Sequence, residues 1–236
     1  MTEPLVLIPG MACDARLFEA QIRALGRDRP VTIALPTQGE RIEEIASNLL
    51  TQLPSKFALL GLSMGGCLAM EILRHAPDRV QRLALLSTTP LADTPQQSAA
   101  REPLIVKLRS GKLDEALREA LPPSAFAAGP GRFEAINLFL AMGAELGPAL
   151  IERQIRALQR RRDQQATLRR LKVPTLVLCG AEDDLSPVKR HEFMADLIPQ
   201  SHLAVIDGAG HLPSIEQPEA VTEELRRWLR QPYLLK

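Results

Sequence analysis

Short apolar runs alternate with amphipathic segments along most of the chain. Six largely apolar runs indicate strands: residues 5–8, 31–35, 57–61, 83–86, 175–179 and 203–206. Five segments carry apolar positions at helical spacing: residues 14–25, 42–53, 67–73, 189–197 and 218–229. Runs that are apolar throughout are typical of strands buried on both faces of a parallel sheet. The alternation therefore predicts a doubly wound α/β fold, with a predominantly parallel sheet of about six strands and helices on both faces.

The alternation stops at Ser87 and resumes at Thr175. Between them the sequence predicts only helices, near residues 98–110, 113–120, 132–143 and 147–170, separated by proline and glycine. We interpret this stretch as an all-helical lid, inserted at about 91–171 into a single domain that spans residues 1–236. Four of its apolar side chains are candidates for a substrate pocket: Phe126, Phe133, Phe139 and Met142. The alternative for each is that it packs the lid onto the body.

The segment from Gly61 to Gly65 reads Gly-Leu-Ser-Met-Gly and lies between a predicted strand and a predicted helix. This context predicts a sharp strand-to-helix turn with Ser63 at its tip. Glycines at 61 and 65 suit such a turn, because side chains there would collide where the strand and helix backbones approach each other. The N–H groups at a helix N-terminus favour the negative charge that develops during acyl transfer. Ser63 is therefore a candidate nucleophile.

A serine nucleophile needs a base and a carboxylate that orients the base. His211 is the only one of the four histidines in a glycine-rich loop that follows a predicted strand. The other three are expected to be structural or solvent-facing: His75, His191 and His202. The carboxylate candidates follow the fifth strand, with one further candidate after the fourth: Glu182, Asp183, Asp184 and Asp93.

Three loops together resemble the α/β-hydrolase superfamily, in the order nucleophile, acid, histidine. They are Gly61-Leu-Ser63-Met-Gly65-Gly66, the Gly180-x-x-Asp183-x-x-x-Pro187 loop, and Gly208-Ala-Gly-His211 followed by Glu216-Gln-Pro218. The resemblance runs across nearly the whole chain and implies a triad of Ser63, Asp183 and His211, with Asp184 as a solvated neighbour. The loop Pro9-Gly10-Met11 resembles the oxyanion loop of the family, although proline stands where the family usually has histidine.

The resemblance also implies details of the site and the sheet. The backbone N–H groups of Met11 and Met64 would be the oxyanion donors. The antiparallel hairpin that commonly precedes the first strand in the family has no counterpart here, so we expect all six strands to be parallel. The loop after the second predicted strand, Ala34-Leu-Pro-Thr-Gln-Gly39, also departs from the usual Asp-x-x-Gly-x-Gly pattern.

These features point to a serine hydrolase that cleaves a carboxylic ester of a small, largely apolar substrate through an acyl-enzyme, without a metal or redox cofactor. The same triad would serve C–C bond hydrolysis, lactone opening or acyl transfer, and fold and triad do not choose among them. A non-catalytic binding module that keeps the pocket is a further alternative, against which the intact triad counts.

The overall composition excludes some partners. The 29 basic and 28 acidic residues give a formal net charge of +1, which provides no attraction of the whole molecule to nucleic acid or to an acidic membrane surface. No apolar run approaches the roughly 20 residues that span a bilayer, and the N-terminus lacks the basic start and apolar stretch of a signal peptide. We expect a cytoplasmic protein that acts on a small molecule.

The cysteines and aromatic residues refine the expected pocket. Cys13, Cys67 and Cys179 are widely spaced and form no Cys-x-x-Cys pair, so they indicate neither a disulfide framework nor a zinc site. Cys13 lies in a loop near the expected site and is a candidate reactive thiol. Aromatic residues are scarce, and Trp228 and Tyr233 belong to the C-terminal helix and tail, so the pocket is expected to be aliphatic and sulfur-rich.

Arginines crowd the end of the predicted lid: Arg153, Arg156, Arg160, Arg161, Arg162, Arg169 and Arg170. A solvated helix face is one interpretation of such a cluster. Binding of an anionic substrate or of an acidic carrier protein is the other.

Overall fold

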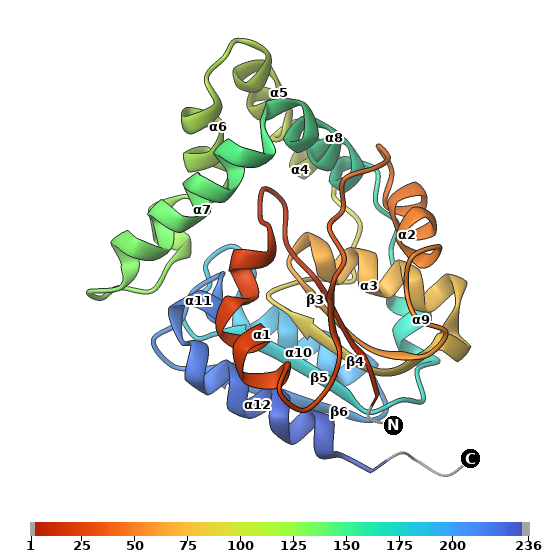
Figure 1. Cartoon of the computed structure of the whole chain (residues 1–236). Helices are drawn as coiled ribbons and strands as arrows, with labels where there is room; N and C mark the ends of the chain where they lie inside the picture. The colour runs from red at the N-terminus through yellow and green to blue at the C-terminus, as the bar shows by residue number, and fades with distance from the viewer. Residues whose placement is uncertain (1–2, 233–236) are drawn as a thin grey trace.

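A parallel sheet forms the centre of the structure, a computed structural model that describes residues 3–232 (Figure 1). Its strands are β1 (Leu5–Ile8), β2 (Val31–Ile33), β3 (Phe57–Leu62), β4 (Val80–Leu86), β5 (Thr175–Gly180) and β6 (Ser201–Ile206). They pair in the order β2-β1-β3-β4-β5-β6, and every pairing is parallel. The predicted parallel sheet of six strands is thus confirmed.

Alternate residues of the central strands point into two separate hydrophobic cores. Leu5 and Leu7 of β1 belong to one core, and Val6 and Ile8 belong to the other. This is the two-residue period of a strand that is buried on both faces. It explains why these strands are recognisable as continuous apolar runs in the sequence.

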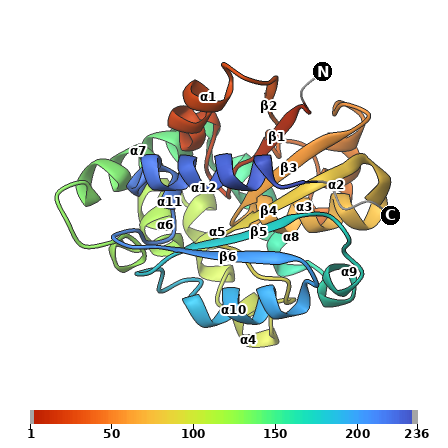
Figure 2. The ribbon, with the colours of Figure 1, turned by 90° about the horizontal axis from the view of Figure 1, so that it is seen from below.

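Helices cover both faces of the sheet (Figure 2). α1 (Glu19–Leu25) and α12 (Pro218–Arg230) pack together on one face. The other face carries α2 (Ile42–Leu50), α3 (Met64–His75), α9 (Gln165–Arg169) and α10 (Val188–Leu197). The short helix α11 (Pro213–Glu216) and the 3-10 turn Pro77–Arg79 complete the body. Trp228 of α12 is buried in the core that contains Leu5 and Leu7. Tyr233 lies outside the described residues.

Two boundaries differ from the sequence expectation for identifiable reasons. The expected helix over 14–25 is a 3-10 turn, Ala15–Phe18, followed by α1, with the Asp14 side chain capping the turn through the Arg16 N–H. Strand β4 begins at Val80 instead of Leu83, because Arg82 interrupts the apolar run without interrupting the strand. The Arg82 Nε donates to Glu3 at 3.0 Å, which compensates for its burial.

The segment between β4 and β5, which we call the helical insertion, comprises helices α4 to α9. The structure describes all of this segment, and it contains no strand. It contains α4 (Pro95–Ala99), α5 (Glu102–Arg109), α6 (Leu113–Ala120), the 3-10 turn Pro123–Ala125, α7 (Arg132–Leu146), α8 (Pro148–Gln159) and α9. Helices α5 to α8 are grouped above the sheet in Figure 1.

The expected helix over 147–170 is broken between α8 and α9. The Gln164 N–H donates to the Pro90 carbonyl at 2.8 Å, and Arg161 forms an ion pair with Asp93 at 2.6 Å. These contacts tie the end of the helical insertion to its beginning.

Within residues 3–232, no single helix has the length and apolar character needed to cross a bilayer. The pair α7 and α8 reaches that length and composition only when joined, and it is bent by 102°.

Candidate active site

Ser63 lies between the end of β3 and the start of α3 in a strained backbone conformation. Its φ of 54° and ψ of −117° are outside the regions that a serine ordinarily adopts. A Cβ at Gly61 would lie 2.1 Å from the Gly65 carbonyl oxygen, and a Cβ at Gly65 would lie 2.0 Å from the Ile8 carbonyl oxygen. Only glycine fits at these two positions, so the turn that presents Ser63 depends on both.

The structure brings together the serine, histidine and aspartate that the sequence nominated. His211 Nε2 is 2.9 Å from Ser63 Oγ, and His211 Nδ1 is 2.9 Å from Asp183 Oδ2 and 3.1 Å from Asp183 Oδ1. Both His211 and Asp183 are 4% exposed. With Nδ1–H donating to Asp183, the free Nε2 faces the hydroxyl as an acceptor, which is the arrangement of a general base.

Asp183 is further fixed by the backbone of its own loop. Its Oδ1 accepts hydrogen bonds from the Leu185 N–H at 3.0 Å and the Ser186 N–H at 2.8 Å. These bonds fix the orientation of the carboxylate beside His211. The other carboxylate candidates have different surroundings: Asp184 is exposed, Glu182 accepts from the Ala128 N–H at 2.9 Å, and Asp93 forms ion pairs with two arginines.

Glu216 holds the loop that carries His211. Its Oε2 accepts from the Gly210 N–H at 2.9 Å and the Ala127 N–H at 2.8 Å, and its Oε1 accepts from the Leu212 N–H at 2.9 Å. The His211 N–H donates to the Ala125 carbonyl at 2.7 Å. Because residues 125 and 127 belong to the helical insertion, the histidine loop is attached directly to that insertion.

Thr88, just beyond β4, connects the serine turn to the aspartate loop. Its Oγ1 donates to the Ser63 carbonyl at 2.8 Å, and its own carbonyl accepts from Ser186 Oγ at 3.2 Å. Its N–H donates to His191 Nε2 at 3.1 Å. Burial lowers the pKa of His191 to about 4, so this imidazole is neutral at physiological pH and its Nδ1–H faces the Pro187 carbonyl at 3.3 Å.

The sequence alone indicates no role for Thr88, and His191, one of the histidines expected to be structural or solvent-facing, is buried. The position of Thr88 just after β4 could have indicated that it lies near the site, because the loops that carry the site residues meet at the carboxyl edge of the sheet. The remaining histidines lie outside this network: His75 is 2.9 Å from Glu71, and His202 is 3.6 Å from Glu224.

The loop after β1 faces the serine. Met11 and Met64 border the same cavity as Ser63, and neither backbone N–H donates a hydrogen bond to another described residue. Gln154 of α8, which is 1% exposed, accepts from the Ala12 N–H at 3.0 Å and donates to the Pro36 carbonyl at 3.2 Å. The helical insertion thus also fixes the loop that carries Met11.

A cavity of about 350 Å³ opens beside Ser63 and His211. Part of its lining is aliphatic or sulfur-containing, as expected: Met11, Met64, Cys67, Ala100, Leu104, Ala120, Leu158 and Leu185. The rest is polar or charged: Ser87, Thr88, Thr89, Asp93, Gln97, Arg101, Glu119, Arg161, Ser186 and Arg190. The charged side chains, which composition alone did not predict, make the cavity amphipathic.

The four nominated pocket residues lie elsewhere. Phe126, Phe139 and Met142 are buried in the core that joins the insertion to the body, with exposures of 2%, 2% and 0%. Phe133 points away from the protein and is 71% exposed. Three of the four side chains thus pack the insertion onto the body, and none of the four lines the cavity beside Ser63.

Cys13 does not have the surroundings of a reactive thiol. Its side chain is buried, and burial together with the nearby Asp14 charge raises its pKa well above the ordinary value. Cys67 and Cys179 are also buried and unpaired.

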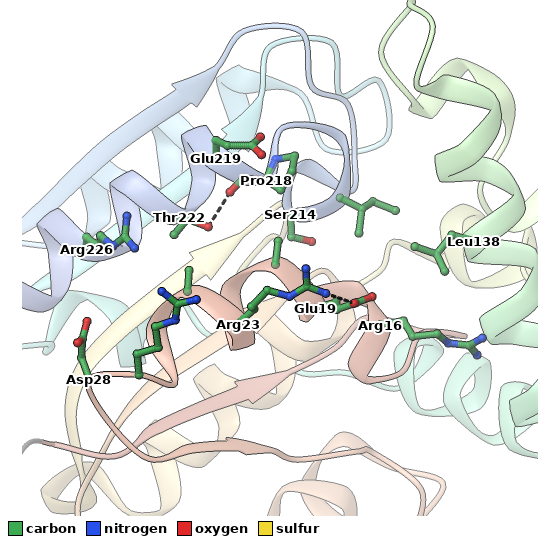
Figure 3. A pocket seen from close by; sticks show the side chains of 14 residues that line it. Arg16, Glu19, Arg23, Asp28, Leu138, Ser214, Pro218, Glu219, Thr222 and Arg226 are labelled. Carbon is green, nitrogen blue, oxygen red and sulfur yellow. Dashed lines mark hydrogen bonds and ion pairs between the residues drawn. The ribbon is translucent and has the colours of Figure 1, made fainter.

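A second cavity, of about 710 Å³, lies between α1 and α12 (Figure 3). Arg16, Arg23, Arg27 and Arg226 line it together with Glu19, Asp28 and Glu219. Arg23 pairs with Glu19 at 2.8 Å, and Arg16 pairs with Asp14 at 2.6 Å. Ser63, Asp183 and His211 do not line this larger cavity, so we assign the candidate active site to the smaller one.

Several of the arginines between 153 and 170 have partners within the chain. Arg153 donates to the Thr37 carbonyl at 3.2 Å, Arg156 pairs with Glu102 at 2.9 Å, and Arg162 pairs with Glu43 at 2.6 Å. Arg161 lines the cavity beside Ser63. Most of this cluster therefore serves contacts within the chain.

Comparison with known proteins gives a consistent result. A sequence model of the alpha/beta hydrolase family matches residues 5–224. The pimeloyl-[acyl-carrier protein] methyl ester esterase of Aromatoleum aromaticum is 30% identical over 196 residues, which are 78% of this chain and 78% of that protein. A solved thermophilic esterase from Thermogutta terrifontis, with malate bound, is 30% identical with a TM-score of 0.89, covering 99% of this chain and 92% of that chain. The enol-lactonase from Burkholderia xenovorans LB400 shares the fold, at 22% identity and a TM-score of 0.85 over 98% of this chain and 92% of that chain. Since the family match spans nearly the whole chain and the relatives agree with it, this protein belongs to the alpha/beta hydrolase family.

Proposed function

We propose that the protein is a serine hydrolase that cleaves a carboxylic ester of a small substrate through an acyl-enzyme on Ser63. The observation that carries this proposal is the continuous hydrogen-bonded chain from Ser63 Oγ through His211 to Asp183, with 2.9 Å at each step. Two relatives at 30% identity are named as esterases, which favours ester hydrolysis over the other reactions of the same triad.

The reaction follows from the positions of these groups. Ser63 Oγ attacks the ester carbonyl while His211 Nε2 accepts its proton, and Asp183 stabilises the imidazolium that forms. The N–H groups of Met11 and Met64 hold the oxyanion, since both border the cavity without a partner among the described residues. His211 then protonates the leaving alcohol, and water repeats the sequence on the acyl-enzyme.

The helical insertion acts as a lid in this proposal. It supplies one wall of the cavity through Leu104, Ala120 and Leu158. A cavity of about 350 Å³ is at the small end of the range for small-molecule sites, so we expect short acyl chains to be preferred.

Turnover of p-nitrophenyl esters of increasing acyl length tests the proposal. Wild type should release p-nitrophenol, and Ser63→Ala should lose at least about 10⁴-fold in kcat while remaining folded. Equal turnover by both proteins would refute the role of Ser63. Labelling by a fluorophosphonate, present in wild type and absent in Ser63→Ala, provides a readout that does not depend on the choice of ester.

The same panel separates the competing reactions. An enzyme specialised for C–C bonds, lactones or acyl transfer should ignore simple esters and act instead on vinylogous diketones, lactones or thioesters with an acceptor. A non-catalytic binding module should neither turn over any of these compounds nor be labelled at Ser63.

A further inference from the structure

Three arginines from separate elements line the cavity beside Ser63, although ester hydrolysis itself requires none of them. Arg101 lies at the start of α5, Arg161 between α8 and α9, and Arg190 in α10. Two carboxylates, Asp93 and Glu119, line the same cavity. The balance between these charges decides what kind of substrate the cavity accepts.

Asp93 is shared by two of the arginines. Arg101 Nε donates to Asp93 Oδ2 at 2.8 Å, and Arg161 Nη2 is 2.6 Å from Asp93 Oδ1. The Asp93 side chain is 2% exposed, that of Arg161 9% and that of Arg101 26%. One carboxylate cannot neutralise two guanidinium groups, so a net positive charge remains in a place where solvation is poor.

Of the guanidinium N–H groups of Arg101 and Arg161, those without a hydrogen-bond partner among the described residues belong mainly to Arg101. Arg161 uses its Nε on the Leu91 carbonyl at 3.0 Å and a further nitrogen on the Leu158 carbonyl at 3.4 Å. In Arg101 only Nε donates to another described residue, which leaves both Nη groups available for an acceptor in the cavity. Asp93 thus holds the Arg101 guanidinium in place through Nε, and the two Nη groups of Arg101 make no hydrogen bond to another described residue.

Arg190 and Glu119 complete the charge balance. Arg190 is exposed, and the one hydrogen bond that its side chain makes to another described residue is with the Leu185 carbonyl at 3.5 Å. Glu119 forms an ion pair with Lys107, a residue that does not line the cavity. Asp93 and Glu119 therefore both have cationic partners, and the charges in the cavity that lack a counter-charge are positive.

We propose that this cavity selects esters that carry a second, ionised carboxylate away from the scissile bond, with Arg101 and Arg190 as the residues that bind it. A planar guanidinium with two free Nη groups suits a carboxylate, because it can donate to both oxygens at once. The inference rests on the proposed function and deepens it, since it names the substrate class of the same site.

The test compares two esters that differ only in charge. Monomethyl adipate carries a carboxylate at the end distal to its ester, and methyl adipamate carries a neutral amide of nearly the same shape. Calorimetric binding to Ser63→Ala measures the preference without turnover, and methanol release by wild type measures it in kcat/KM. We expect the acid to be preferred at least about 10-fold, and the preference to fall as salt screens the charges.

Arg190→Gln, made in each background, should reduce this preference towards one. Lys189→Gln is the matched control, since it removes the same charge from the neighbouring exposed residue that does not line the cavity. Arg101→Gln is the second variant, and its thermal unfolding shows whether losing a partner of Asp93 disturbs the fold. An equal Kd for acid and amide, or a preference that survives both arginine substitutions, would overturn the inference.

The two readouts also separate this inference from the proposed function. Selective binding of the acid without turnover of any ester would retain the anion site and reject the esterase. Turnover of both methyl esters at the same kcat/KM would retain the esterase and reject the anion site.

Discussion

Glu216 provides a quantitative test of how the histidine loop is held. The carboxylate accepts hydrogen bonds from three backbone N–H groups, of Gly210, Leu212 and Ala127, at 2.8–2.9 Å. Glu216→Gln keeps the size of the side chain but leaves one oxygen to accept, and it turns an NH₂ group towards a backbone donor. At least one charge-assisted bond is lost, worth about 1.5–3 kcal/mol, and the remaining ones become neutral and weaker. We expect a loss of about 2–4 kcal/mol in the free energy of unfolding.

The same substitution should reduce activity, because His211 follows directly on one of the released residues. A shift of about 1 Å in a catalytic group costs about 10²-fold in rate, so we expect kcat on a p-nitrophenyl ester to fall by about 10- to 100-fold. Urea unfolding followed by circular dichroism measures the first effect. Glu219→Gln is the control, since the Glu219 side chain is exposed and no hydrogen bond or ion pair joins it to another described residue. If Glu216→Gln unfolds within about 0.5 kcal/mol of wild type, the reasoning on this loop is wrong.

Three further predictions concern the aspartate, the serine turn and the buried histidine. Asp183→Asn should fold but lose about 10⁴-fold in kcat, since an amide no longer selects the histidine tautomer that accepts the serine proton; kcat within 10-fold of wild type would exclude Asp183 as the orienting carboxylate. Gly65→Ala should be destabilised by more than about 3 kcal/mol or fail to fold, because its Cβ would lie 2.0 Å from the Ile8 carbonyl oxygen. Gly131→Ala is the control and should be neutral, because a Cβ there meets nothing within 4 Å. Similar melting temperatures for the two variants would contradict the steric argument. Burial lowers the pKa of His191 from 6.5 to about 4, so the unfolded chain binds the proton more readily and stability should fall as pH decreases from about 6.5 to about 4, by at most about 3 kcal/mol. His191→Gln should flatten this part of the stability profile measured by urea unfolding, and an unchanged profile would show that another group is responsible.

Parts of the site that depend on local sequence were predictable. The Gly-Leu-Ser-Met-Gly turn and the His211 loop each follow an apolar run, and the carboxyl ends of parallel strands meet at one edge of the sheet. That geometry is enough to expect Ser63, His211 and the carboxylates after β5 near one another, whereas the choice of Asp183 among them follows from the family resemblance. Their catalytic roles, and those of the Met11 and Met64 N–H groups, stay predictions that the kinetic experiments test.

Parts that depend on packing between distant segments were not predictable. Gln154 contacts the loop after β1, and His191 contacts Thr88, across more than a hundred residues of sequence in each case. Nothing in the local pattern around a single glutamine or histidine indicates such a partner. The nominated aromatic residues illustrate the same limit, because the burial of Phe126 and the exposure of Phe133 depend on how the segments of the insertion pack against the body.

The attachment of the helical insertion to the body has a consequence for how activity is gained and lost. Gln154 accepts from the loop that carries Met11, and Ala125 accepts from the His211 N–H, so docking of the insertion helps to fix both loops. A partly unfolded molecule that keeps its sheet and its helices but releases the insertion would retain much of its circular dichroism signal while losing the hydrogen bonds from the insertion to both loops. We therefore expect turnover to report the docking of the insertion more sensitively than circular dichroism does. During refolding, activity should return after the sheet has formed.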